Sequence, residues 1–158
     1  MRTDLDHLPR AKQRELERVV QIIFEEFDEQ IARATMDWKR KGRILKIILY
    51  GSYARGNWVD EPHTAKAYQS DFDLLIIVND KRLTARVEYW TKVEDRLIRE
   101  LSFTKTLRTP VNFIVHTLQE VNDGLAHGRY FFIDVSREGI ALYQSDDREL
   151  HTPKPKSP

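Results

Sequence analysis

Residues 44–56 read ILKIILYGSYARG, and residues 70–78 read SDFDLLIIV. Both stretches are almost wholly apolar over seven residues and rich in isoleucine, a pattern typical of strands buried on both faces. We therefore predict two buried strands, Ile44–Tyr50 and Phe72–Val78. The segment between them, residues 57–70, is polar and without a hydrophobic period, which predicts a loop.

Two carboxylates stand where the second strand opens. Residues two apart in a strand point to the same face, roughly 6–7 Å apart along the chain, so Asp71 and Asp73 are expected to aim together. Two converging carboxylates beside an apolar strand are costly to desolvate unless they are paired or bind a cation. Mg²⁺ accepts one or two carboxylates and takes further ligands from substrate phosphates. The pair therefore predicts a magnesium site.

The turn after the first strand suits a phosphate group. Gly51 allows backbone N–H groups to approach a ligand closely, and Ser52 is placed to cap a short helix whose first N–H groups point outward. Arg55, one turn later, can add charge-assisted contacts. A polyphosphate turn beside a carboxylate pair indicates in-line phosphoryl or nucleotidyl transfer, with a metal bridging the two parts.

The rest of the chain predicts an α/β fold, a small sheet with helices packed on it. From near Pro9, apolar residues recur at steps of three and four through Ile31, which predicts an amphipathic helix of about five to seven turns. Residues 39–42 form a polar break. We also predict a helix over 83–103, a strand over Val111–Thr117, helices over 118–127 and Tyr130–Glu138, and a short edge strand over 140–143. The buried face of the 83–103 helix is expected to hold Val87, Trp90, Val93, Leu97, Ile98 and Leu101.

Composition excludes several classes of function. The chain has 158 residues, enough for one domain, and no cysteine, which excludes disulfides and thiolate metal sites. Twenty-six basic residues balance 25 acidic ones, so no whole-chain field favours nucleic acid or a membrane surface. No apolar stretch is long enough to span a membrane and no signal peptide is visible, which predicts a cytoplasmic protein.

The C-terminal segment differs from what precedes it. Residues 144–158 are polar, and the last six include three prolines and two lysines, a linker composition. We therefore predict a domain over 1–143 and a linker or tail over 144–158 that leads to a further, helical domain.

The GSYARG turn followed by SDFDLLI resembles the nucleotidyltransferase superfamily of DNA polymerase β, and within it the minimal prokaryotic nucleotidyltransferases. The motifs cover about residues 44–78, with a weaker likeness to about Tyr143. The resemblance implies a polymerase β palm-like fold, phosphate binding at Gly51 and Ser52, and up to two Mg²⁺ ions at Asp71 and Asp73. It also implies a nucleoside triphosphate substrate, ATP being the expected one, and a helical partner of the HEPN type or a dimer.

One position departs from the family pattern. The resemblance implies a third carboxylate on the third strand, where this chain carries Asn112, an amide that cannot act as a base. Two functions therefore stay open. One is Mg²⁺-dependent transfer of a nucleoside monophosphate to a hydroxyl of a small molecule or protein. The other is a catalytically weakened nucleotide-binding or antitoxin-like module that acts with a HEPN-type partner.

Other candidate residues have two interpretations. His116 shares the expected face of Asn112, about 13 Å along the strand, and is either near the site or a structural residue at the strand end. Tyr53 and Trp58 either stack on a base or pack. Surface or bystander roles are predicted for His63, Glu120, Asp123, Arg129, Arg137 and Glu138.

Overall fold

The structure is a computed structural model that describes residues 1–61, 68–145 and 150. Its centre is a four-stranded sheet in the order β5-β4-β1-β6. These strands are β1 (Ile44–Tyr50), β4 (Phe72–Val78), β5 (Val111–Thr117) and β6 (Ile140–Gln144). β1 runs antiparallel to both β4 and β6, whereas β5 is parallel to β4. The sheet is therefore mixed, and the predicted α/β class is confirmed.

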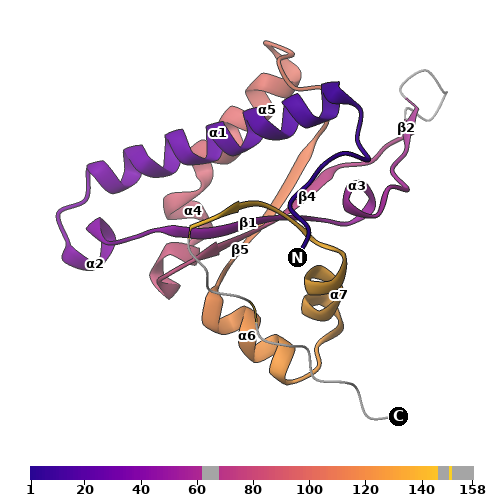
Figure 1. Cartoon of the computed structure of the whole chain (residues 1–158). Helices are drawn as coiled ribbons and strands as arrows, with labels where there is room; N and C mark the ends of the chain where they lie inside the picture. The colour runs from indigo at the N-terminus through magenta and orange to yellow at the C-terminus, as the bar shows by residue number, and fades with distance from the viewer. Residues whose placement is uncertain (62–67, 146–149, 151–158) are drawn as a thin grey trace.

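Helices cover both faces of the sheet (Figure 1). One face packs against α1 (Arg10–Ala32) and α5 (Thr91–Ser102), and the other against α6 (Leu118–Ala126) and α7 (Tyr130–Glu138). Alternation along β4 separates the two cores: Leu74 and Ile76 join the α1/α5 side, whereas Leu75 and Ile77 join the α6/α7 side. Asp71 and Asp73 have the same parity as Leu75, so the strand directs them to the α6/α7 side.

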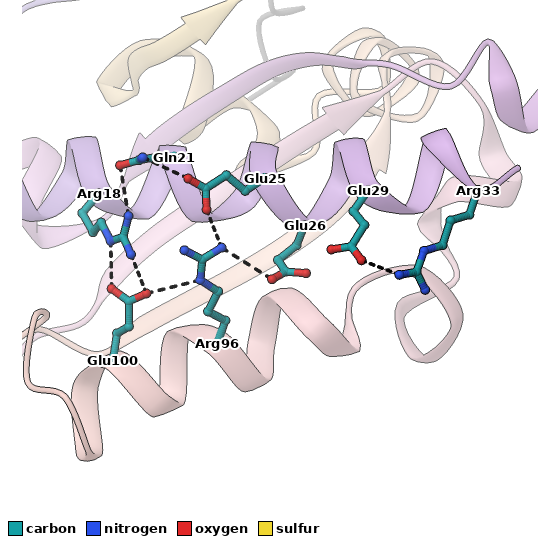
Figure 2. A network of polar contacts seen from close by, with 8 residues as sticks. All are labelled: Arg18, Gln21, Glu25, Glu26, Glu29, Arg33, Arg96 and Glu100. Atoms are coloured by element: carbon teal, nitrogen blue, oxygen red, sulfur yellow. Dashed lines mark hydrogen bonds and ion pairs between the residues drawn. The ribbon is translucent and has the colours of Figure 1, made fainter.

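The predicted long helix is α1. It begins after Pro9, whose fixed φ suits the residue before a helix, and its apolar stripe buries Leu16, Val19, Ile23 and Phe27. On its flank, Arg96 of α5 lies 2.5 Å from Glu25 and 3.5 Å from Glu26 (Figure 2). Arg18 makes a two-pronged contact with Glu100 of α5, at 2.8 and 2.9 Å. This network joins the two helices on the face that the sheet does not cover.

The single helix predicted over 83–103 is wrong. The chain instead forms a 3₁₀ turn η1 (Lys81–Thr84), a short helix α4 (Arg86–Tyr89) and then α5. Trp90 is fully buried and its indole nitrogen donates to the carbonyl of Leu83 at 2.7 Å, which holds the chain in a bend. Because the axis changes there, α4 does not continue the apolar stripe of α5, and Val87 is 85% exposed. Within α5, Val93 and Leu97 are buried, whereas Ile98 lies off that face and is 51% exposed.

The sequence also missed short elements. A short helix α2 (Asp37–Arg40) overlaps the start of the polar break, and the predicted loop contains the paired strands β2 (Asp60–Glu61) and β3 (Tyr68–Gln69). Elements of two to four residues are too short to show a hydrophobic period. Residues 62–67 of that loop, with His63, lie outside the described residues.

The C-terminal half follows the prediction closely, with one correction. The predicted helices over 118–127 and Tyr130–Glu138 are α6 and α7, and the edge strand is β6. Glu120 is not a solvated charge: it forms a capping box with Thr117 at the start of α6. β6 extends to Gln144, one residue into the predicted tail; of the remaining tail the structure describes only Ser145 and Leu150. Within the described ranges, no helix is long and apolar enough to cross a membrane.

Candidate active site

The two sequence motifs meet at one end of the sheet. β1 ends there and β4 and β5 begin there, because β1 is antiparallel to β4 and β5 is parallel to it. Asp73 is the register partner of Tyr50 on one side and of Asn112 on the other. The sheet therefore brings the carboxylate pair, the glycine turn and Asn112 together from three strands.

Gly51 lies directly against Asp73. Its φ of 76° is in the region that glycine tolerates and other residues rarely adopt. A Cβ built at this position would lie 2.5 Å from Oδ2 of Asp73, far inside van der Waals contact. Two separate reasons therefore require glycine at position 51: the backbone conformation of the turn and the close approach of a carboxylate.

The short helix α3 (Ser52–Arg55) follows the turn. Its first backbone hydrogen bonds run from Ala54 and Arg55 to the carbonyl of Gly51, at 3.1 and 3.0 Å. The amides of Ser52 and Tyr53 precede those donors and have no carbonyl one turn back within the helix. The prediction that Ser52 caps this helix is wrong: Gly51 is the N-cap, and no side-chain cap bond is made.

Asn112 contacts the first carboxylate. Its amide nitrogen donates to Oδ2 of Asp71 at 2.5 Å. Burial and the neighbouring charge of Asp71 raise the pKa of Asp73, and the opposing effects of Asn112 and Arg55 do not cancel that increase. Two carboxylates that repel each other in a partly buried position are a site where a cation would be favourable.

The donor set fits magnesium better than a softer metal. Asp71 and Asp73 supply carboxylate oxygens, and Asn112 carries an amide oxygen as well as its nitrogen. Among the described residues there is no group of three or more histidine, cysteine, aspartate or glutamate side chains that could hold a metal. A pair of carboxylates that leaves further positions to water and phosphate suits Mg²⁺.

Arg55 reaches the site but already has a partner. Its guanidinium lies 3.3 Å from the carboxylate of Glu138 on α7, and both side chains are about two-fifths exposed, at 44% and 40%. Arg55 also acts to lower the pKa of Asp73, which places its charge near the carboxylate pair. Glu138, predicted as a plain surface charge, therefore holds the side chain that was predicted to bind phosphate.

Other predicted candidates lie elsewhere. His116 is the register partner of Ile77, near the opposite end of β5, where it contacts Glu120 and the ring of Phe132. Tyr53 is fully buried, and Trp58 stacks on it at 5.4 Å between ring centroids. Base stacking by Tyr53 is therefore excluded, because both faces of its ring are inside the protein.

Tyr50 also lies at this site, although it was not among the residues predicted from the sequence. Its position opposite Asp73 puts the phenol ring on the carboxylate face, where it meets Phe131 edge-on at 5.4 Å. Burial and Asp73 raise the pKa of Tyr50, so the phenol stays neutral. Its place in the sequence could have predicted this, because the last residue of a strand lies next to any ligand that the following turn binds.

Comparison with known proteins agrees with this geometry. The family model described as polymerase beta, nucleotidyltransferase matches residues 35–123, which is more than half of the chain and includes β1, α3, β4 and β5. A protein of Methanocaldococcus jannaschii named "Putative protein adenylyltransferase MJ0604" is 51% identical over 39 residues, 25% of this chain and 31% of that relative. The match thus spans less than a third of the relative's length. No solved structure matches. On the family match, the chain belongs to the polymerase beta nucleotidyltransferase family.

Proposed function

We propose that this protein is a Mg²⁺-dependent nucleotidyltransferase that moves a nucleoside monophosphate from a nucleoside triphosphate to a hydroxyl group. The observation that carries the proposal is the contact of Gly51 with Asp73. A turn suited to phosphate lies against a carboxylate suited to a metal, so one metal–polyphosphate unit can bind both.

Each side chain then has a role. The backbone amide of Ser52 and the guanidinium of Arg55 bind phosphate oxygens, and Gly51 gives them room. Asp71 and Asp73 hold the magnesium. When bound, Mg²⁺ neutralises charge that develops on the phosphates and helps to orient them.

The reaction is an in-line displacement at the α-phosphorus. The acceptor oxygen forms a bond to that phosphorus, the bond from the phosphorus to the bridging oxygen breaks, and pyrophosphate leaves. The acceptor's proton passes to a carboxylate or to water, because the amide of Asn112 is not a base. Asn112 instead holds Asp71 in place through its 2.5 Å hydrogen bond.

The name of the relative supports a narrower version. An adenylyltransferase acting on protein uses an adenosine nucleotide, and this favours ATP as the donor and a protein hydroxyl as the acceptor here. A small-molecule hydroxyl is the other acceptor class. A HEPN-type helical partner or a second copy of this chain would supply the protein acceptor.

Asn112 supports a second candidate function. A site with two carboxylates and an amide carries less negative charge than one with three carboxylates, and it lacks the base that speeds deprotonation of the acceptor. In that case the protein is a nucleotide-binding regulatory or antitoxin-like module that acts through a partner.

Calorimetric titration of ATP into the purified protein, with and without Mg²⁺, tests the binding site. Wild type is expected to bind only with Mg²⁺, and Asp71→Ala and Asp73→Ala are expected to lose that binding. Asp95→Ala is the matched control, since it removes an exposed carboxylate from α5. Unchanged binding in both site variants would show that the metal site is wrongly assigned.

Transfer is tested separately, with ATP labelled on the α-phosphate and with the protein itself and a HEPN-type helical protein as candidate acceptors. Mg²⁺-dependent label on a hydroxyl, with equal release of pyrophosphate, is the expected result. Tight Mg²⁺-dependent binding without any transfer would favour the second candidate function.

A further inference from the structure

A buried lysine lies behind the active site, on the side of the sheet away from the carboxylates. Lys12, in the first turn of α1, is 8% exposed. Its ammonium donates to Oγ1 of Thr109 at 2.6 Å and pairs with Asp60 at 3.2 Å and Glu15 at 3.4 Å. One ammonium thus joins α1, the strand β2 and the turn that enters β5.

Glu15 completes the hold on that turn. One of its carboxylate oxygens accepts hydrogen bonds from the backbone amides of Arg108 and Thr109, at 2.7 and 2.9 Å. Its other oxygen accepts from the hydroxyl of Thr109 at 3.2 Å. Thr109 is fully buried, so all of its polar atoms that make these bonds are kept from water. Lys12 and Glu15 therefore anchor the turn to α1 as one polar unit.

The anchored turn leads directly into the site. The carbonyl of Pro110 accepts from the amide of Phe72 at 2.8 Å, and Phe72 separates Asp71 from Asp73 in the chain. Asn112 follows Pro110 by two residues, and it donates to Asp71. A shift of the turn would therefore move Asn112 and the carboxylate pair relative to each other.

The same lysine also faces the helix that follows the phosphate turn. Its ammonium lies 5.6 Å from the ring centroid of Tyr53 on α3 and 6.0 Å from that of Phe72. The hydroxyl of Tyr53 is buried and has no hydrogen-bond partner among the described residues. Lys12 is therefore packed against the elements that carry both halves of the site.

A lysine is a costly choice for this position. Burial acts to lower the pKa of Lys12, but Glu15, Tyr53 and Asp60 outweigh that effect and raise it, so the group is charged at neutral pH. A buried ion pair often stabilises a fold no better than apolar side chains of the same size. The ammonium of a lysine can donate hydrogen bonds in three directions to separate segments, whereas a methionine side chain of similar size has no donor.

We propose that Lys12 is a positioning residue for nucleotidyl transfer, which sets the β5 entry turn and α3 relative to the carboxylate pair. This rests on the proposed function. Misplacement of reacting groups by about 1 Å can cost about a hundredfold in rate, even when the substituted residue is far from the chemistry. Lys12 acts through Thr109 and Tyr53 and touches no substrate.

The main test compares Lys12→Met with Arg96→Met. Both remove a cation that links α1 to another segment, but Arg96 lies in the α1–α5 network on the outer face (Figure 2). Lys12→Met is expected to lower kcat by at least about tenfold, with a change in the KM for MgATP below about threefold. Arg96→Met is expected to lower the melting temperature only. Lys12→Arg, which keeps the charge, is expected to restore part of kcat.

A second readout does not depend on activity. Amide ¹⁵N–¹H shifts of Gly51, Asp73 and Asn112 are expected to move in Lys12→Met and in the milder Thr109→Val, and to stay in place in Arg96→Met. If the Lys12 and Arg96 variants lose stability alike and those shifts and kcat hold in both, Lys12 is a structural residue and the proposal is overturned. If wild type neither binds nor transfers nucleotide, the proposed function fails, and the amide shifts still decide whether Lys12 positions this site.

Discussion

Asn112 and Asp71 are 41 positions apart in the chain, yet the amide nitrogen of one lies 2.5 Å from a carboxylate oxygen of the other. The contact exists because β5 pairs with β4 in parallel, which sets Asn112 opposite Asp73. In many proteins a carboxylate pair is neutralised by a cation; here an amide N–H supplies part of that neutralisation.

Replacing Asn112 by aspartate is the sharpest test of this contact. Asn112→Asp removes the donor and adds a third negative charge, so without Mg²⁺ the melting temperature is expected to fall, and Mg²⁺ is expected to restore it. With Mg²⁺ and ATP, transfer is expected to rise by at least about tenfold, because a base becomes available. Thermal denaturation with and without Mg²⁺ and a label-transfer assay measure the two effects.

Gln119→Glu is the control for that experiment, because it adds the same charge at an exposed position on α6. A fall in stability of the same size in both variants, with or without Mg²⁺, would mean that the site charge has no special role.

A methyl group at Gly51 should disrupt the glycine turn that we propose to bind phosphate. Gly51→Ala places a Cβ against Oδ2 of Asp73 and strains a φ of 76°, so we expect a loss of about 1–3 kcal/mol in unfolding free energy and loss of MgATP binding. Gly56→Ala is a close match, since its φ is 93° but its Cβ would meet only a ring carbon of His7 at 3.9 Å. Calorimetry should find MgATP binding intact in Gly56→Ala; equal loss in both would indicate backbone strain alone.

The ion pair between Arg55 and Glu138 is expected to compete with substrate. Glu138→Gln weakens the hold on the guanidinium, so the affinity for MgATP should rise modestly, by about two- to fivefold, in keeping with about 0.2–1 kcal/mol for an exposed pair. Arg55→Met should lower the affinity for MgATP. Binding isotherms at low and high salt measure the effect, which should shrink as salt increases. If wild type and Arg55→Met bound MgATP with the same affinity, Arg55 would not contribute to the binding site.

Acid should weaken the start of α6 through Glu120. Burial acts to raise the pKa of Glu120, but the Thr117 amide, Lys81 and His116 outweigh it and lower the pKa to about 2. A lowered folded-state pKa gives stability that is complete above the unfolded value of 4.5 and is lost as pH falls toward 2. Denaturant unfolding at pH 6 and pH 3 should therefore show wild type losing about 1–2 kcal/mol more than Glu120→Gln.

Asp123→Asn serves as the control for the acid experiment, because Asp123 is exposed on the same helix. If it changed the pH dependence as much as Glu120→Gln does, the effect would belong to the general charge of α6 and not to the capping box.

Local patterns predicted the parts of the site that lie close together in the chain. The alternation that puts Asp71 and Asp73 on one face is a property of any strand, and the glycine turn after Ile44–Tyr50 is visible from composition. The apolar stripe of α1 was predicted in the same way, from residues three and four positions apart in the chain. Where a bend depends on a distant contact, prediction failed: the 83–103 helix breaks at Trp90, whose burial against Phe27 and Phe113 no local period reveals.

The sequence by itself therefore determined the strands, the carboxylate pair and the glycine turn, because each is set by spacing within a few residues. Only the tertiary structure decided which distant groups face them. The register of β1, β4 and β5 placed Gly51 against Asp73 and Asn112 against Asp71, and the packing of α7 gave Arg55 its partner Glu138. Strand order and register depend on how whole faces pack, and a shift of one residue in β4 or β5 would have turned the side chain of Asp73 or Asn112 to the other side of the sheet.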